Sequence, residues 1–322
     1  MSGRTSSVRV DRDRVRAAMT GPITAIHPPF ERDGSIDVVG LREEVERGIA
    51  ARSGTMLLTY GDSLHSLLTD AEVGAVLDVV VDQTRGRALV VAADRQWWTG
   101  EEIRFATFAR DAGADVLMVL PPTWGAGVTH DSLVAHYRAV SEHIPVMLVT
   151  APFIVDQALG LRVIATLVDQ VPGIVAIKDD VIGAFARRMA VLVHERWAVI
   201  SGGQKQNHLD LHPYGCDGYM STYQHFIPAI AHAYWARIVG GDMSGAARIV
   251  RDYDHPWMTF ADTLPGGFDA MFHGAQEVFG VAGRWRRSPY HSLTDAELER
   301  LRGFLDALPA IETGLPDERE RA

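Results

Sequence analysis

A lysine at the end of a short apolar run is the residue best suited to covalent chemistry in this chain. The run 174–177 (IVAI) follows a Pro-Gly turn and precedes Lys178, which predicts a strand buried on both faces with Lys178 at its carboxyl end. Of the 31 lysines and arginines, only Lys178 and Lys205 are lysines. A guanidinium stays protonated, whereas an amine in an apolar site loses its proton more easily and can attack a carbonyl to form an imine. Lys178 is therefore either an imine-forming nucleophile or a strand-end lysine that reaches solvent.

Small polar residues follow other predicted strands. Thr59 and Tyr60 would offer hydroxyl donors to a substrate carboxylate, and Gly61 would let backbone amides approach it. Tryptophans after the third and fourth strands could line an apolar pocket, or they could pack between neighbouring βα loops or between subunits. Threonine and serine at strand ends are also ordinary turn formers. The residues predicted to bind substrate are Gly61, Asp62, Trp97, Trp124, Thr150, Ser201, Gly202 and Ser221.

These side chains share one site only if their strands lie side by side. Apolar runs of strand type alternate with helical patterns at a spacing typical of βαβ units, which predicts a (β/α)8 TIM barrel, with a doubly wound open sheet as the competitor. In such a barrel the carboxyl ends of all strands form the active face. The predicted strands are 23–27, 55–59, 88–92, 116–119, 146–150, 174–178, 198–201 and 218–221, and the predicted helices between and after them are 38–51, 70–83, 101–112, 132–142, 161–170, 184–194, 206–212 and 228–239.

The chain divides into a barrel and a helical region. Residues 1–20 are expected to form a tail with a short helix, 21–239 the barrel, 240–312 a C-terminal helical region and 313–322 a disordered tail. Capping-box patterns, in which a hydroxyl and a carboxylate satisfy the first amides of a helix, begin at Thr69 and Thr99. The C-terminal region is expected to hold helices near 246–253, at 267–279 and from Thr294 to residue 308.

Composition excludes several kinds of partner. The 322-residue chain has a formal net charge of −10 and no basic run, which argues against nucleic acid or an anionic membrane and favours a small molecule. The single cysteine, Cys216, excludes an internal disulfide framework and fits a cytoplasmic location. No apolar run is long enough to cross a bilayer, and residues 1–16 do not resemble a secretory signal.

Two further patterns are weaker. His208 and His212 share one helical face at a metal-ligand spacing, but no third ligand accompanies them, so they are interpreted as surface histidines and no metal is predicted. Ser201, Gly202 and Gly203 could suggest a phosphate loop, yet the rest of a P-loop is absent.

The assembled segments resemble the dihydrodipicolinate synthase and N-acetylneuraminate lyase family of class I aldolases, from about residue 21 to residue 308. The resemblance implies a (β/α)8 barrel with C-terminal helices, assembled as a homotetramer or homodimer. It also implies that Lys178 forms a Schiff base with pyruvate or another 2-oxo acid, without a metal or an organic cofactor. The segments that carry it are 28–37 (PPFERDGSID), 59–63 (TYGDS), 112–115 (AGAD), 174–179 (IVAIKD), 215–221 (GCDGYMS) and 282–290 (AGRWRRSPY).

The departures from the family pattern affect proton transfer and specificity. The family tyrosine at the end of the fifth strand, a proton relay, is Val149 here. The arginine that many synthases carry shortly after that strand is missing from 153–156 (FIVD), which argues against lysine biosynthesis because the acid substrate would lose a charge-assisted contact. The aromatic pair after the fourth strand reads 121–124 (PPTW), and the second threonine of the carboxylate loop is Tyr60.

The sequence therefore predicts a metal-independent lyase or aldolase acting on a 2-oxo acid and an aldehyde, with Lys178 as nucleophile and Tyr60 as acid/base. His27, Asp62 and Thr150 stand behind Tyr60 as candidates for the relay. Trp97, Trp98 and Trp124 suggest an aldehyde half that is larger and more apolar than a semialdehyde, such as an aromatic one. Two alternatives remain open: a dehydratase of a deoxy-oxo sugar acid that uses the same imine, and a catalytically silent barrel that binds a keto acid.

Overall fold

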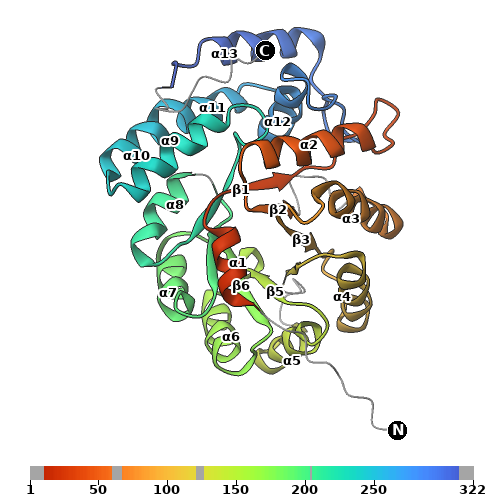
Figure 1. The fold of residues 1–322 in the computed structure, drawn as a ribbon, viewed down its shortest axis with the longest axis vertical. Coiled ribbons are helices and arrows are strands. Elements are labelled where there is room, and N and C mark those ends of the chain that lie inside the picture. The colour runs from red at the N-terminus through yellow and green to blue at the C-terminus, as the bar shows by residue number, and fades with distance from the viewer. Residues whose placement is uncertain (1–10, 60–66, 121–126, 204, 312–322) are drawn as a thin grey trace.

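The chain folds into a closed barrel of eight parallel strands surrounded by helices (Figure 1). The computed structural model describes residues 11–59, 67–120, 127–203 and 205–311. Each strand pairs with the next one in the sequence, and β8 pairs with β1, so the predicted TIM barrel is confirmed and an open sheet is excluded. The strands are β1 (Gly21–Ile26), β2 (Thr55–Leu58), β3 (Leu89–Ala93), β4 (Val116–Val119), β5 (Val146–Val149), β6 (Ile174–Asp179), β7 (Ala198–Ser201) and β8 (Gly218–Ser221).

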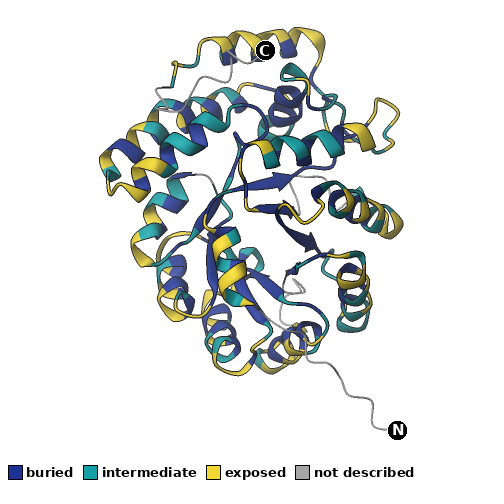
Figure 2. Cartoon of the chain, in the orientation of Figure 1, coloured by how far each residue is buried: buried dark blue, intermediate teal, exposed yellow. Residues whose placement is uncertain are grey.

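Helices surround the barrel and bury one face each against it (Figure 2). Their apolar residues recur at helical spacing, so one stripe of each helix is buried while the opposite face stays exposed. Most of these helices begin and end within a few residues of the predicted bounds. They are α2 (Val38–Ala50), α3 (Asp70–Thr84), α4 (Thr99–Ala112), α5 (His130–Ser141), α6 (Gln157–Gln170), α7 (Gly183–Val193), α8 (Lys205–Leu211) and α9 (Pro228–Val239).

The short N-terminal helix α1 (Arg12–Met19) packs at the amino-terminal end of the strands. The Arg16 guanidinium donates to Asp217 at 3.0 Å and to the carbonyls of His194 and Trp197 at 2.6 and 2.7 Å, which satisfies backbone oxygens next to β7 and β8. Met19 is fully buried. This contact leaves the opposite, carboxyl-terminal face of the barrel for the site.

One of the two predicted capping boxes is present, and the helix predicted from Thr294 also begins with a capping box. The Thr69 and Thr294 hydroxyls accept the amides of Glu72 and Glu297, and those carboxylates reach back to the cap amides. The box predicted at Thr99 is wrong: Trp98 is the N-cap residue and makes no side-chain cap bond. Glu102 is instead fully buried, close to the Asp94 carboxyl group. Tertiary burial of the carboxyl group has displaced the local cap.

The C-terminal helices pack on one side of the barrel around a separate apolar cluster, in which the Phe226 and Trp257 rings stack with centroids 5.6 Å apart (Figure 1). The single short helix predicted at 246–253 is longer and passes through a π-helical turn at 250–254. None of the described helices has the length and apolarity that a membrane-spanning helix needs. The helices are α10 (Met243–Ile249), α11 (His255–Ala261), α12 (Gly267–Val278) and α13 (Asp295–Asp306).

The prediction of surface histidines is wrong for His208. Its side chain is fully buried, because α8 packs against β8 and α9, and its Nδ1 lies 2.9 Å from the Tyr234 hydroxyl. Burial lowers the pKa of His208 to about 3, so the imidazole is neutral. His208 therefore belongs to the packing of α8, while His212 is half-buried at the end of that helix.

A buried ion pair connects the barrel to the C-terminal region. Lys205 Nζ lies 2.7 Å from Asp254 Oδ1 in the π-helical turn, and the two side chains are 2% and 3% exposed. The ammonium also lies 4.3 Å from the centroid of the Tyr223 ring. Burial lowers the pKa of Lys205, and Asp254 opposes that shift. The second lysine of the chain thus has a structural partner.

Removing one partner of this pair should destabilise the fold strongly. Lys205→Met leaves the Asp254 carboxylate buried without its cation, so we expect the free energy of unfolding to fall by about 3 to 5 kcal/mol in urea denaturation. The double variant Lys205→Met/Asp254→Leu removes both charges and should recover part of that loss. Equal stability of the wild-type protein and the single variant would contradict a structural role for the pair.

Candidate active site

Lys178 occupies the carboxyl end of β6 and contacts one carboxylate. Its Nζ lies 2.8 Å from each oxygen of Asp180, two residues further along the chain. The two side chains are 12% and 23% exposed, so the pair is shielded but reachable from the barrel mouth. Sequence reasoning placed Lys178 correctly at the strand end and missed Asp180. The signal for Asp180 was its place in the same segment, directly after the strand.

A buried hydrogen-bond network holds this pair in position. The Thr150 hydroxyl donates to Asp179 Oδ1 at 2.9 Å and accepts the Asp180 amide at 2.9 Å. Asp179 in turn accepts the amides of Val181 and Ile182, at 3.3 and 3.1 Å. Burial raises the pKa of Asp179, and its hydrogen bonds oppose that shift. Thr150 is fully buried with its hydroxyl engaged in both directions, so the geometry gives it a positioning role for Asp180.

Gly202 lies against the lysine–carboxylate pair. Its amide donates to the Asp179 carbonyl at 2.8 Å. A Cβ added at residue 202 would lie 2.0 Å from Asp180 Oδ1 and 2.6 Å from Lys178 Nζ. The chain after β7 can therefore approach the pair this closely only with glycine.

The position of the family tyrosine is next to Lys178 and is apolar. Val149 and Lys178 are partners in the β5–β6 register, and Val149 is 3% exposed. A valine side chain cannot transfer a proton. Among the described residues, Asp180 is the group in hydrogen-bonding contact with Lys178 Nζ that can do so.

The other predicted site residues do not all lie in one place in the structure. Thr59, Ser201 and Ser221 follow or end β2, β7 and β8 and are buried, as strand-end residues of the barrel mouth. Trp97 lies apart from them, beside α3 and α4. The predictions for Tyr60, Gly61, Asp62 and Trp124 fall outside the described residues.

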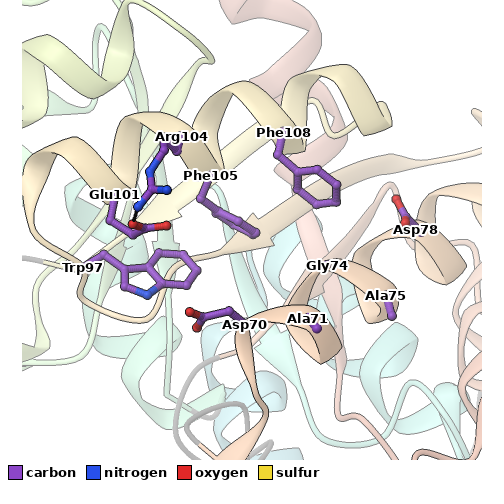
Figure 3. A pocket seen from close by; sticks show the side chains of 10 residues that line it. All are labelled: Asp70, Ala71, Gly74, Ala75, Asp78, Trp97, Glu101, Arg104, Phe105 and Phe108. Atoms are coloured by element: carbon purple, nitrogen blue, oxygen red, sulfur yellow. Dashed lines mark ion pairs between the residues drawn. The ribbon is translucent and has the colours of Figure 1, made fainter.

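Trp97 lines a groove between α3 and α4 (Figure 3). Its indole packs on Phe105 with ring centroids 4.8 Å apart, and the groove has a volume of about 440 Å³. None of the residues that line it is part of the Lys178 network. Trp98 is 70% exposed. The direct ring contact of Trp97 is with Phe105 of α4, the helix that follows it in the chain, so the indole packs within its own βα unit.

Two carboxyl groups meet beneath the loop after β3. Asp94 and Glu102 are both fully buried and interact electrostatically with each other, while Asp94 Oδ2 accepts the Leu120 amide at 3.2 Å. Burial raises the pKa of both groups, and the neighbouring charge of Asp94 raises that of Glu102 further. The pair therefore keeps a proton that two exposed carboxylates would lose.

This shared proton should make stability depend on pH. The unfolded chain releases the proton above about pH 4 and the folded chain keeps it, so the free energy of unfolding falls as the pH rises through the neutral range. Glu102→Gln keeps the size of the side chain and cannot ionise. Its stability should decline less between about pH 6 and about pH 9 than that of the wild-type protein, measured by urea denaturation. The exposed-site control Glu299→Gln should decline as the wild type does, and an equal decline in Glu102→Gln would contradict this account.

A closed barrel with a shielded lysine at a strand's carboxyl end defines the class, a (β/α)8 enzyme with its site on that face of the sheet. The model described as "Dihydrodipicolinate synthetase family" matches residues 18–308, and the chain belongs to this family. The resemblance found in the motifs is confirmed, and the protein is a lyase of the class I aldolase family.

Curated relatives are divergent and carry two kinds of name. A Streptomyces coelicolor protein named "Probable 5-dehydro-4-deoxyglucarate dehydratase 2" is 28% identical over 310 residues, which cover 94% of this chain and 93% of the relative. A 4-hydroxy-tetrahydrodipicolinate synthase from Methylococcus capsulatus is 30% identical over 72% of this chain and 79% of its own length.

Solved structures share the fold. A dihydrodipicolinate synthase from Oceanobacillus iheyensis superposes with a TM-score of 0.81 at 21% identity, covering 92% of this chain and 99% of that one. An N-acetylneuraminate lyase from Fusobacterium nucleatum gives a TM-score of 0.78 at 16% identity, covering 91% and 100%.

Proposed function

We propose that this protein is an imine-forming lyase that acts on pyruvate or another 2-oxo acid, with Lys178 as its nucleophile and Asp180 as the proton-transfer group. The observation that carries the proposal is the contact of Lys178 Nζ with both oxygens of Asp180. The chain's family membership supports the imine chemistry, and Val149 beside Lys178 explains why another group must move the protons.

The Asp180 carboxylate first takes a proton from the Lys178 ammonium. The neutral amine adds to the C2 carbonyl, and a proton passes from nitrogen to oxygen to give a carbinolamine. Asp180 returns its proton to the hydroxyl, which leaves as water, and a protonated imine joins Nζ to C2. The imine draws electrons from the neighbouring carbon, so C3 can lose a proton to Asp180 and leave an enamine. In a substrate with a hydroxyl group on C4, Asp180 instead takes the hydroxyl proton, the C3–C4 bond breaks, C4 leaves as the aldehyde and the bonding electrons form the same enamine.

The remaining site assignments complete this proposal. Thr59, Tyr60 and the backbone at Gly61 hold the substrate carboxylate, with Asp62, Ser201, Gly202 and Ser221 around the rest of the substrate. Buried strand-end positions of Thr59, Ser201 and Ser221 support this arrangement. Thr150 positions Asp180. Trp97 has no observed contact with the Lys178 network among the described residues, and Trp124 lies outside them.

A dehydratase of a deoxy-oxo sugar acid is the second candidate. The relative from Streptomyces coelicolor, matched over 94% of this chain, carries the name of such an enzyme. Its reaction would use the same imine at Lys178 and then eliminate a hydroxyl group instead of cleaving a carbon–carbon bond. We further propose a cytoplasmic enzyme that assembles as a homodimer or homotetramer, as the family resemblance implies.

Reductive trapping tests the nucleophile. Pyruvate with borohydride should leave one reduced adduct per chain, located on the peptide that contains Lys178. Lys178→Arg keeps a cation beside Asp180 but cannot form an imine, so its mass should stay unchanged. Because Lys205 is the only other lysine and is 2% exposed, an adduct mapped to Lys205 or absent from the wild type would contradict the proposal.

Isotope exchange separates the two candidate relays. The wild-type enzyme in D2O should exchange the C3 protons of pyruvate through the enamine, followed by NMR. Asp180→Asn should slow this exchange by about 100-fold or more, because general acid–base catalysis contributes at least that much. Tyr60→Phe is the matched variant and should exchange within a few-fold of the wild type. The opposite pattern would assign the relay to Tyr60.

A further inference from the structure

Three metal-ligating side chains converge away from the Lys178 network. His27 follows β1, Glu44 lies in α2, and His225 follows β8, so three elements far apart in the sequence supply them. Their candidate donor atoms all lie within 4.8 Å of one another. The side chains are 5%, 0% and 3% exposed, which places the group in the interior.

His225 has no hydrogen-bond partner among the residues that the structure describes. Neither of its ring nitrogens is bonded to any described residue, although the imidazole is buried. A buried imidazole without partners pays the cost of desolvation at both nitrogens, and native structures rarely leave such a group unsatisfied. The Phe272 ring packs beside it, with centroids 5.9 Å apart, and offers no polar partner.

Glu44 is a buried carboxyl group with no cationic partner among the described ion pairs. Its Oε2 accepts the His27 amide at 2.9 Å, and its Oε1 accepts Gln276 Nε2 at 2.7 Å. Each oxygen keeps a second lone pair for a further bond. A carboxylate buried without a charge partner is costly to desolvate. The carboxyl group therefore needs either a proton or a cation, and Arg47, the neighbouring cation, pairs with Glu43 at 2.7 Å.

His27 is oriented for ligation. Its Nδ1 lies 3.1 Å from the Ala25 carbonyl, so Nδ1 donates to that oxygen and the lone pair is on Nε2. A backbone carbonyl in this place commonly fixes the tautomer of metal-bound histidines. The Gln276 side-chain amide orients the Glu44 carboxylate in the same way, by donating to Oε1.

We propose that His27, Glu44 and His225 bind a divalent transition-metal ion of the Zn²⁺ type. Two imidazoles and one carboxylate form a borderline-soft set that suits zinc or cobalt, and three protein ligands leave a position for water. Bonds of about 2.0 Å would bring the donors to roughly 3.3 Å from one another, so the side chains must move inward by an ångström or so. The ion would give His225 a partner and Glu44 its cation.

The ion would join three elements that the barrel brings together. Ligands from the end of β1, from α2 and from the segment after β8 would be fixed to one point, with α12 attached through Gln276. None of the ligands belongs to the Lys178 network. The inference therefore goes beyond the proposed function and does not depend on it.

Cobalt substitution tests the site. Protein stripped with a chelator and titrated with Co²⁺ should bind one ion per chain and develop visible absorption bands of a histidine-ligated ion, and Zn²⁺ should displace them and raise the melting temperature. Glu44→Gln and His225→Asn should abolish the bands and the thermal shift. Gln276→Met changes only the outer contact and should weaken Co²⁺ binding by about 10- to 100-fold.

Controls exclude other sites and separate this inference from the imine chemistry. His212→Asn removes the other neighbouring histidine pair and should bind Co²⁺ as the wild type does. Lys178→Arg should also bind it normally, whatever the outcome of reductive trapping. If one variant fails to fold, the remaining two still decide the question. A wild-type protein that binds no Co²⁺, or binds it equally well in all the site variants, would overturn the proposal and leave Glu44 as a buried protonated acid.

Discussion

The contact between Lys178 and Asp180 depends on the register in which the closed barrel holds its strands. Strands β5, β6 and β7 must keep their register for Thr150, Asp179 and Gly202 to meet above Val149. The Thr150 hydroxyl joins β5 to the segment after β6, and the Gly202 amide joins the segment after β7 to Asp179. The charged pair is therefore positioned by backbone pairing and by one buried hydroxyl.

The sequence was sufficient for the architecture because buried parallel strands are continuous apolar runs. The predicted runs at 116–119, 198–201 and 218–221 coincide with β4, β7 and β8. Lys178 was also predictable, because a lysine at the end of such a run is chemically distinctive in a chain that otherwise uses arginine. The family comparison exposed Val149, which the β5–β6 register then placed beside the lysine.

What sequence reasoning missed was the partner of each polar group. Asp180 looked like any acidic residue after a strand, and only its rotamer in the folded chain brings both oxygens to Nζ. Thr99 and Glu102 have the spacing of a capping box, yet the folded chain buries the Glu102 carboxyl group beside Asp94. His208 was judged by its helix alone, and the side chains that bury it come from β8 and α9. Local patterns do not encode these distant contacts.

The near absence of lysine has a practical consequence for handling the protein. Amine-directed reagents find two lysines in the chain besides the N-terminus, and Lys205 is 2% exposed and paired with Asp254. The remaining lysine is the one in the candidate site. Cross-linkers, amine-coupled surfaces and aldehyde fixatives would therefore either attach at the N-terminus or occupy the barrel mouth, so a surface-tethered form of this protein is better anchored through another group.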